Sequence, residues 1–315
     1  MTGNTGNTGR RGNDGQLRAM AGDTNKPTVS VTALPVSPNA QIARIARLPD
    51  STNCPSVTTA TRYYLGIDIG SWSTKAVLID GQKRVVGKCL RRSGVELKKV
   101  AEECRDEALR QAGAKLADVK RTVATGFGRD AMKADGVRTE ISCHARGAFF
   151  HFPREITVID IGGQDNKVIR VSPAGKHIAF KMNRKCAAGT GAFLEEVALK
   201  LDIPLKDFTE LARKSTKKLS IGAFCTVFTS TEVLSLIRKG EKKEDIVRGL
   251  LASVAARVME MEPISGTVVL TGGVIAFNPG LKDVFEQDYG LHVEIPPDPQ
   301  YTGALGAALY AADRQ

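Results

Sequence analysis

The sequence predicts an α/β protein made of two related lobes, and three observations support this. A D-I-G-x-x-x-x-K pattern occurs twice, with its aspartates at Asp68 and Asp160 and a spacing of 92 residues between the copies. Each copy lies between the first and second of three consecutive predicted strands. The chain has 315 residues, enough for two lobes with a sizeable core. Two matched loops in matched positions indicate a duplicated lobe.

The N-terminal segment differs in composition from the rest of the chain. Residues 1–61 are rich in Thr, Asn, Gly, Ser and Pro, begin with T-G-N-T-G-N-T-G, and show no sustained periodicity. Such a composition buries too little apolar surface to offset the entropy of ordering, so we expect a disordered tail. A transit peptide and a misplaced start codon, with Met20 as an internal start, are the alternatives.

The first lobe is expected over residues 62–155. The segment Y-Y-L-G-I-D-I-G is a buried strand that runs into a glycine turn, and K-A-V-L-I-D and R-V-V-G-K-C-L follow as strands. Residues 97–112 then read as a helix, because Leu97, Val100, Cys104 and Ala108 recur on one face.

The second lobe is expected over residues 156–315. Its strands I-T-V-I-D-I, N-K-V-I-R-V and K-H-I-A-F-K-M repeat the order of the first lobe. Two later strands, T-V-V-L-T before a diglycine and L-H-V-E-I-P, belong to the same lobe. Helices are expected over residues 192–201, 205–214, 230–239, 242–261 and 303–312.

The two loops predict a site for ATP between the lobes, which is typical of the RNase H-like fold of the actin, hexokinase and Hsp70 type. Glycines let backbone N–H groups approach phosphates, and hydroxyl and lysine side chains add donors. Asp68 and Asp160, at the ends of two facing strands, are suited to hydrated Mg²⁺. The residues assigned to the nucleotide on these grounds are Gly70, Ser71, Ser73, Thr74, Lys75, Gly162, Gly163, Gly272 and Gly273.

Two catalytic roles follow from the same site. Asp160 is the expected catalytic carboxylate, and Gln164 is the candidate that orients the attacking water, as polar side chains do in phosphoryl transfer. Gln164 could instead hydrogen-bond its own loop. The loops match neither a Walker A pattern nor a dinucleotide fingerprint. A single such loop would be read as an ordinary β-turn; the repeated pair with a later T-G-G favours the nucleotide site.

Two of the six cysteines stand where predicted helices begin. Cys186 lies in M-N-R-K-C-A-A-G-T-G and Cys225 in G-A-F-C-T-V-F, and a helix N-terminus stabilises a thiolate. A cubane cluster takes four cysteines, so a two-fold dimer would supply two from each subunit. Buried small side chains are the alternative, and this is the reading for Cys89, Cys104 and Cys143. His144 is expected to pack, and Glu140 has no assigned role.

Over about residues 63–312 the chain resembles the activators (component A) of 2-hydroxyacyl-CoA dehydratases and the ATPase subunits of benzoyl-CoA reductase. The matching segments include G-I-D-I-G-S-W-S-T-K, E-I-S-C-H-A-R-G-A, D-I-G-G-Q-D-N-K, M-N-R-K-C-A-A-G-T-G, F-C-T-V-F, L-T-G-G-V and P-Q-Y-T-G-A-L-G-A-A-L. The resemblance implies one [4Fe-4S] cluster shared by two subunits, with Cys186 and Cys225 as its ligands. It also adds Trp72 and Gln300 to the nucleotide site.

The resemblance implies an ATP-driven electron activator that acts on an acyl-CoA dehydratase or reductase component, as a homodimer or a pseudo-symmetric heterodimer with a paralogue. Its expected donor is an acidic ferredoxin or flavodoxin, which the net charge of +11 suits. A small-molecule kinase without a cluster is the alternative on this fold, and a non-enzymatic ATP-dependent sensor is another.

Composition excludes other classes of partner. No stripe alternates Lys or Arg with aromatic residues, so we expect no nucleic acid. No apolar stretch is long enough to cross a bilayer, so we expect no membrane. Six cysteines without an export signal favour the reducing cytoplasm.

Overall fold

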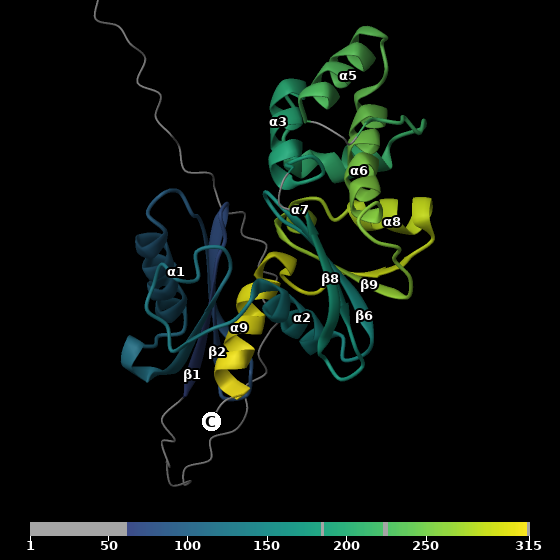
Figure 1. Cartoon of the computed structure of the whole chain (residues 1–315). Coiled ribbons are helices and arrows are strands. Elements are labelled where there is room, and N and C mark those ends of the chain that lie inside the picture. Colours follow the sequence, from purple (N-terminus) through teal and green to yellow (C-terminus); the bar gives the residue numbers. More distant parts are fainter. Residues whose placement is uncertain (1–61, 184–185, 223–225, 314–315) are drawn as a thin grey trace, which may run out of the picture. The chain divides into compact units, whose positions relative to one another are not determined.

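The structure, a computed structural model, describes residues 62–183, 186–222 and 226–313 (Figure 1). The expected tail, residues 1–61, and Cys225 lie outside the described residues, so the predictions made for them stay predictions.

Two five-stranded sheets form the centre of the fold, and they share one strand order. The first has the order β3–β2–β1–β4–β5. The second, read from the corresponding edge, has the order β8–β7–β6–β9–β10. In each sheet three consecutive strands pair antiparallel, and the fourth and fifth are added in parallel beside the first. The strands are β1 (Tyr63–Ile69), β2 (Ser73–Asp80), β3 (Val85–Arg92), β4 (Val119–Thr125), β5 (Gly136–Val137), β6 (Ile156–Ile161), β7 (Asn166–Val171), β8 (His177–Asn183), β9 (Thr267–Thr271) and β10 (His292–Glu294).

The duplication extends to the register of individual residues. Asp68 pairs with Lys75 across β1 and β2, and Asp160 pairs with Lys167 across β6 and β7. Every residue of β6 is buried, and so is every residue of β1 after Tyr63, as expected for strands covered on both faces. The predicted duplicated lobe is therefore confirmed.

Helices cover both sheets. They are α1 (Leu97–Gln111), α2 (Glu140–His151), α3 (Gly191–Leu201), α4 (Phe208–Arg213), α5 (Thr226–Arg238), α6 (Lys243–Met259), α7 (Gly273–Phe277), α8 (Leu281–Tyr289) and α9 (Thr302–Asp313). Short 3₁₀ turns occur at Leu116–Asp118, Leu205–Asp207 and Pro299–Tyr301. The helix expected over residues 230–239 begins earlier, at Thr226, and the one expected over 205–214 begins with a 3₁₀ turn.

Two helices pack on the sheet of the other lobe and not on the sheet whose strands precede them in the sequence. The C-terminal helix α9 shares a core with Tyr64, Val77 and Val123 of the first sheet, whereas α2 packs with strands β6 and β7 of the second. The two helices also contact each other (Figure 1). The expected boundary between the lobes at residues 155/156 stays a prediction. It assigns α2 to the first lobe and α9 to the second, whereas each helix packs on the sheet of the other lobe.

The α2–α9 crossing depends on glycine and gives a stability prediction. A Cβ atom on Gly306 would lie 1.8 Å from the Cys143 carbonyl oxygen. We expect Gly306→Ala to destabilise the protein by about 1–3 kcal/mol, because overpacking outweighs the gain of at most about 1 kcal/mol in helix propensity. Urea unfolding measures this. Gly81→Ala is the control, since no atom lies within 4 Å of its Cβ; equal midpoints for the two variants would contradict the prediction.

Candidate nucleotide-binding site

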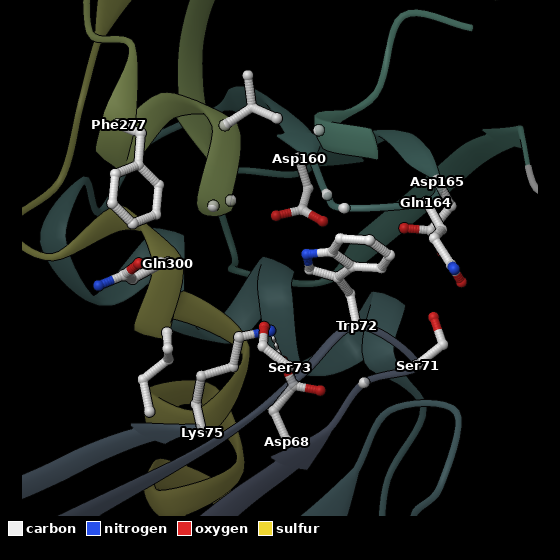
Figure 2. A pocket seen from close by; sticks show the side chains of 18 of the residues that line it. Asp68, Ser71, Trp72, Ser73, Lys75, Asp160, Gln164, Asp165, Phe277 and Gln300 are labelled. Carbon is white, nitrogen blue, oxygen red and sulfur yellow. Dashed lines mark ion pairs between the residues drawn. The ribbon is translucent and has the colours of Figure 1, made fainter. Parts of the chain in front are cut away.

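A cavity of about 320 Å³ lies where the loops of the two sheets meet. Figure 2 shows Asp68, Ser71, Trp72 and Ser73 of the first loop near Asp160 and Gln164 of the second, with Phe277 and Gln300 farther along the wall. The predicted site residues that line it are Asp68, Gly70, Ser71, Trp72, Ser73, Lys75, Asp160, Gly162, Gly163, Gln164, Gly272, Gly273 and Gln300. Residues far apart in the sequence thus meet at one cavity.

Thr74 is the predicted nucleotide residue that does not line the cavity. Its side chain is fully buried, and its Oγ1 lies 2.9 Å from Ser93 Oγ. The Ser93 hydroxyl in turn donates to the Gly70 carbonyl at 2.5 Å. Successive residues of a strand point to opposite faces, so Ser73 and Lys75 face the cavity while Thr74 supports the loop from below. This placement corrects the expected contact between Thr74 and the nucleotide.

The two loops close with the same backbone hydrogen bond. The Gly70 N–H donates to the Ser73 carbonyl at 3.2 Å, and the Gly162 N–H donates to the Asp165 carbonyl at 2.9 Å. In both cases a glycine is required by close approach, since a Cβ would lie 2.8–2.9 Å from an oxygen of the same loop. The shared turn leaves two similar loops on opposite walls of the cavity.

Asp160 is buried among polar groups at the bottom of the cavity. Lys167 Nζ donates to its Oδ2 at 3.1 Å, and Thr271 Oγ1 donates to its Oδ1 at 3.0 Å. His144 Nδ1 lies 3.3 Å from the same Oδ1. Burial by itself would raise the pKa of Asp160, but the charges of His144 and Lys167 outweigh it and hold that pKa below its usual range. The carboxylate therefore stays ionised near neutral pH.

The equivalent lysines of the two loops have different surroundings. Burial would lower the pKa of Lys167, but Asp160, Asp165 and Glu140 raise it above its usual range. Its Nζ lies 2.8 Å from Asp165 and 3.8 Å from Glu140. Lys75 lies 3.6 Å from Asp68, and its side chain is more exposed than that of Lys167, 16% against 4%. Lys75 is thus the better placed of the two to offer charge to a phosphate.

Two residues of α2 belong to the site although the sequence did not assign them there. Both His144 and Glu140 line the cavity, one beside Asp160 and the other beside Lys167. The segment E-I-S-C-H-A-R was the available signal, since it places two ionisable side chains at helical spacing on one face. Cys143, between them, is fully buried, and burial raises the pKa of its thiol to about 12.

The carboxylates at the ends of β1 and β6 fit a hydrated Mg²⁺ ion. Both are oxygen ligands, which Mg²⁺ prefers, and both line the cavity. Each oxygen of Asp160 already accepts one hydrogen bond from the protein, and Mg²⁺ usually keeps several of its own water molecules when protein carboxylates bind it. Within residues 62–183, 186–222 and 226–313, no group of three or more His, Cys, Asp or Glu side chains is arranged to hold a metal ion.

Cys186 lies outside the cavity, on the segment that enters α3. It is the only cysteine in the described part of the chain that is not buried. The segment is bonded to the second loop, because Asn166 Nδ2 donates to the Gly189 carbonyl at 3.0 Å. The N–H groups of Gly191 and Ala192 donate to the carbonyls of Gly162 and Gly163, each at 2.9 Å.

No helix in the described part of the chain is long and apolar enough to cross a membrane.

Two lobes of one strand order, with paired aspartate-glycine loops facing a shared cavity, define an ATPase of the actin and hexokinase fold type. Residues 65–311 match the BadF/BadG/BcrA/BcrD ATPase family, and the chain belongs to that family. The expected fold, family and ATPase activity are thereby confirmed.

The chain is similar to proteins that activate acyl-CoA dehydratases. It is 45% identical over 254 residues to the (R)-2-hydroxyglutaryl-CoA dehydratase activating ATPase of Acidaminococcus fermentans, covering 79% of this chain and 96% of the relative. A benzoyl-CoA reductase subunit of Thauera aromatica is 31% identical, with 79% and 93% covered. The solved activator of the 2-hydroxyisocaproyl-CoA dehydratase from Clostridium difficile, with bound ADPNP, has a TM-score of 0.75 and 38% identity, with 80% and 94% covered.

Proposed function

We propose that the protein is an ATP-hydrolysing electron activator that passes a low-potential electron to an acyl-CoA dehydratase or reductase component. The observation that carries the proposal is the bonding of the second phosphate loop to the start of α3. Two backbone hydrogen bonds, from Gly191 to Gly162 and from Ala192 to Gly163, join them. The second phosphate loop is therefore bonded directly to the start of α3, a few residues after Cys186.

A [4Fe-4S] cluster shared by two subunits fits the cysteines of this chain. Cys186 is partly exposed, as a ligand at a subunit boundary must be, whereas Cys89, Cys104 and Cys143 are buried. Cys225 is the proposed second ligand and lies outside the described residues. A cluster needs four cysteines, so two subunits supply a full set. When bound, it would supply one-electron chemistry at low potential.

In this proposal ATP occupies the cavity between the loops. Asp68 and Asp160 hold hydrated Mg²⁺, Lys75 and the loop glycines contact the phosphates, and Gln164 orients the attacking water. Gly272, Gly273 and Gln300 line the cavity and receive the adenosine. Figure 2 shows Gln300 near Phe277 on one wall. ATP can shift the position of α3 only through a difference in affinity for two arrangements of the loops. The loop–α3 hydrogen bonds provide the physical link for that difference.

The partners follow from the relatives and from charge. Identity to the A. fermentans dehydratase activator exceeds identity to the benzoyl-CoA reductase protein, 45% against 31%, which favours an acyl-CoA dehydratase component as the electron acceptor. The net charge of +11 suits an acidic ferredoxin or flavodoxin as donor. A small-molecule kinase is less supported, since these relatives carry other activities.

The experiment that tests this function compares nucleotide states of the anaerobically purified protein. ADP with aluminium fluoride, or ATP, is expected to change the EPR spectrum of the reduced protein and to speed iron removal by a ferrous chelator. Hydrolysis of ATP is measured on the same samples. If nucleotide is bound and hydrolysed while the spectrum and the chelation rate stay constant, the coupled mechanism is wrong and an ordinary ATPase remains.

A further inference from the structure

Trp72 is the only tryptophan of the chain, and it lies against the opposite phosphate loop. A Cβ atom on Gly163 would lie 2.6 Å from Trp72 Cγ and 2.8 Å from its Cδ1. The indole therefore packs directly on glycine backbone, and any side chain at position 163 would displace it. Figure 2 shows the ring between the first loop and Asp160. This packing is a direct contact between the two phosphate loops.

The indole is also in contact with a cation that reaches α3. The guanidinium carbon of Arg92 lies 4.4 Å from the centre of the indole ring, within the range of a cation–π contact. Arg92 Nη2 also lies 3.4 Å from Glu195 Oε2. Arg92 ends β3 and Glu195 belongs to α3. One side chain thus connects the loop of the first lobe to the helix that follows Cys186.

These contacts form a closed ring. Trp72 contacts Gly163, the Gly163 carbonyl accepts from the Ala192 N–H at 2.9 Å, and Ala192 lies about one helical turn before Glu195. Glu195 pairs with Arg92, and Arg92 lies over the Trp72 ring, which completes the ring of contacts. The ring joins both phosphate loops to α3, whereas the backbone hydrogen bonds by themselves join only the second loop.

We propose that Trp72, Arg92 and Glu195 form a closing contact that transmits the nucleotide state of the first phosphate loop to α3. This inference rests on the proposed function and names the positioning residues for its coupling step. Arg92 and Glu195 keep side-chain exposures of 69% and 37%, so their ion pair is weak. A weak pair forms and breaks with little cost. Because Trp72, Arg92 and Glu195 also line the cavity, a bound polyphosphate contacts the same group and biases it.

The experiment uses the full-length protein, purified anaerobically, with ADP and with ADPNP and Mg²⁺. Indole emission, excited beyond tyrosine absorption, reports on Trp72 because no other tryptophan is present. Hydrogen exchange reports on α3. We expect ADPNP to change the emission and to alter amide exchange in Gly191–Leu201 by at least about threefold relative to ADP. In Arg92→Ala and Glu195→Gln that difference in α3 should disappear when the nucleotide is saturating, a condition that calorimetry sets for each variant because Arg92 and Glu195 line the cavity.

Two control variants remove the same kinds of charge from neighbouring positions and leave the contact between Trp72, Arg92 and Glu195 intact. Glu196→Gln removes the next carboxylate on α3, which pairs with Lys200 of the same helix. Arg91→Ala removes a neighbouring cation that pairs with Glu103 of α1. Both should respond to ADPNP as the wild type does. Folding of every variant is checked by circular dichroism and by calorimetric nucleotide binding.

The outcomes separate this inference from the proposed function. If nucleotide binds but emission stays unchanged, or if α3 still responds in Glu195→Gln, transmission runs through the second-loop backbone and the closing contact is wrong. If emission and α3 respond as expected but no electron reaches an acceptor, the closing contact stands and the electron-activator proposal fails.

Discussion

Replacing Cys186 by alanine is expected to remove the iron of the anaerobically purified protein. The wild type should contain about four irons per dimer and absorb as a cubane cluster does, and the variant should contain almost none, because three or fewer thiolates remain from any shared set. Iron analysis and the visible absorption spectrum measure this. The effect is large because a homodimer of the variant loses one cysteine from each subunit and so keeps only two of the four.

The matched control is Cys104→Ala. Cys104 is fully buried in α1, and burial raises the pKa of its thiol above the usual range, so it is not a ligand candidate. Its Sγ lies 3.5 Å from Cys89 Sγ within the core of the first lobe. This variant should keep its iron and lose only some stability from the small cavity. A wild-type protein that stays colourless and free of iron after anaerobic reconstitution would contradict the cluster proposal.

The second large effect is expected at the two loop aspartates. Asp160→Asn and Asp68→Asn should each lower the rate of ATP hydrolysis by at least about a hundredfold, since phosphoryl transfer depends on positioned charge and on the metal ion. Both should also raise the Mg²⁺ concentration needed for half-maximal rate. Steady-state hydrolysis at varied Mg²⁺ and ATP measures the two quantities.

The fold is expected to survive these substitutions. Asparagine keeps the shape of the side chain, and Lys167 still has Asp165 at 2.8 Å when Asp160 loses its charge. Asp135→Asn is the control: its carboxylate accepts from the Thr122 N–H at 2.7 Å and does not line the cavity. Full ATPase activity in both loop variants would rule out the two-loop phosphate site.

Much of the fold could be read from the sequence because it was repeated. The repeated D-I-G-x-x-x-x-K pattern predicted two matched loops, each between the first and second of three strands. The structure adds that the aspartate and the lysine of each copy pair across those two strands. Continuous apolar runs predicted buried strands. The site could be predicted to the extent that it lies in these loops, because backbone turns of glycine and aspartate have a strong local signature.

Side-chain direction was only partly predicted. Ser73, Thr74 and Lys75 were assigned together, yet strand alternation turns Thr74 away toward Ser93. That error was avoidable from the sequence. His144 and Glu140 were different: their role depends on α2 lying beside β6 and β7, which no local pattern specifies.

The sequence by itself determined the two lobes, the three consecutive strands that begin each of them, the phosphate loops and the family. Only the tertiary structure decided that α9 covers the first sheet and α2 the second. It also decided that Lys167 is ion-paired with Asp160 and Asp165 while Lys75 is more exposed, and that Trp72 joins the two loops. The physical reason is the separation in sequence over which each kind of interaction acts. Periodicity, turns and caps act over a few residues of chain, whereas these contacts join segments that are distant in sequence and form only when side-chain shapes and charges pack together.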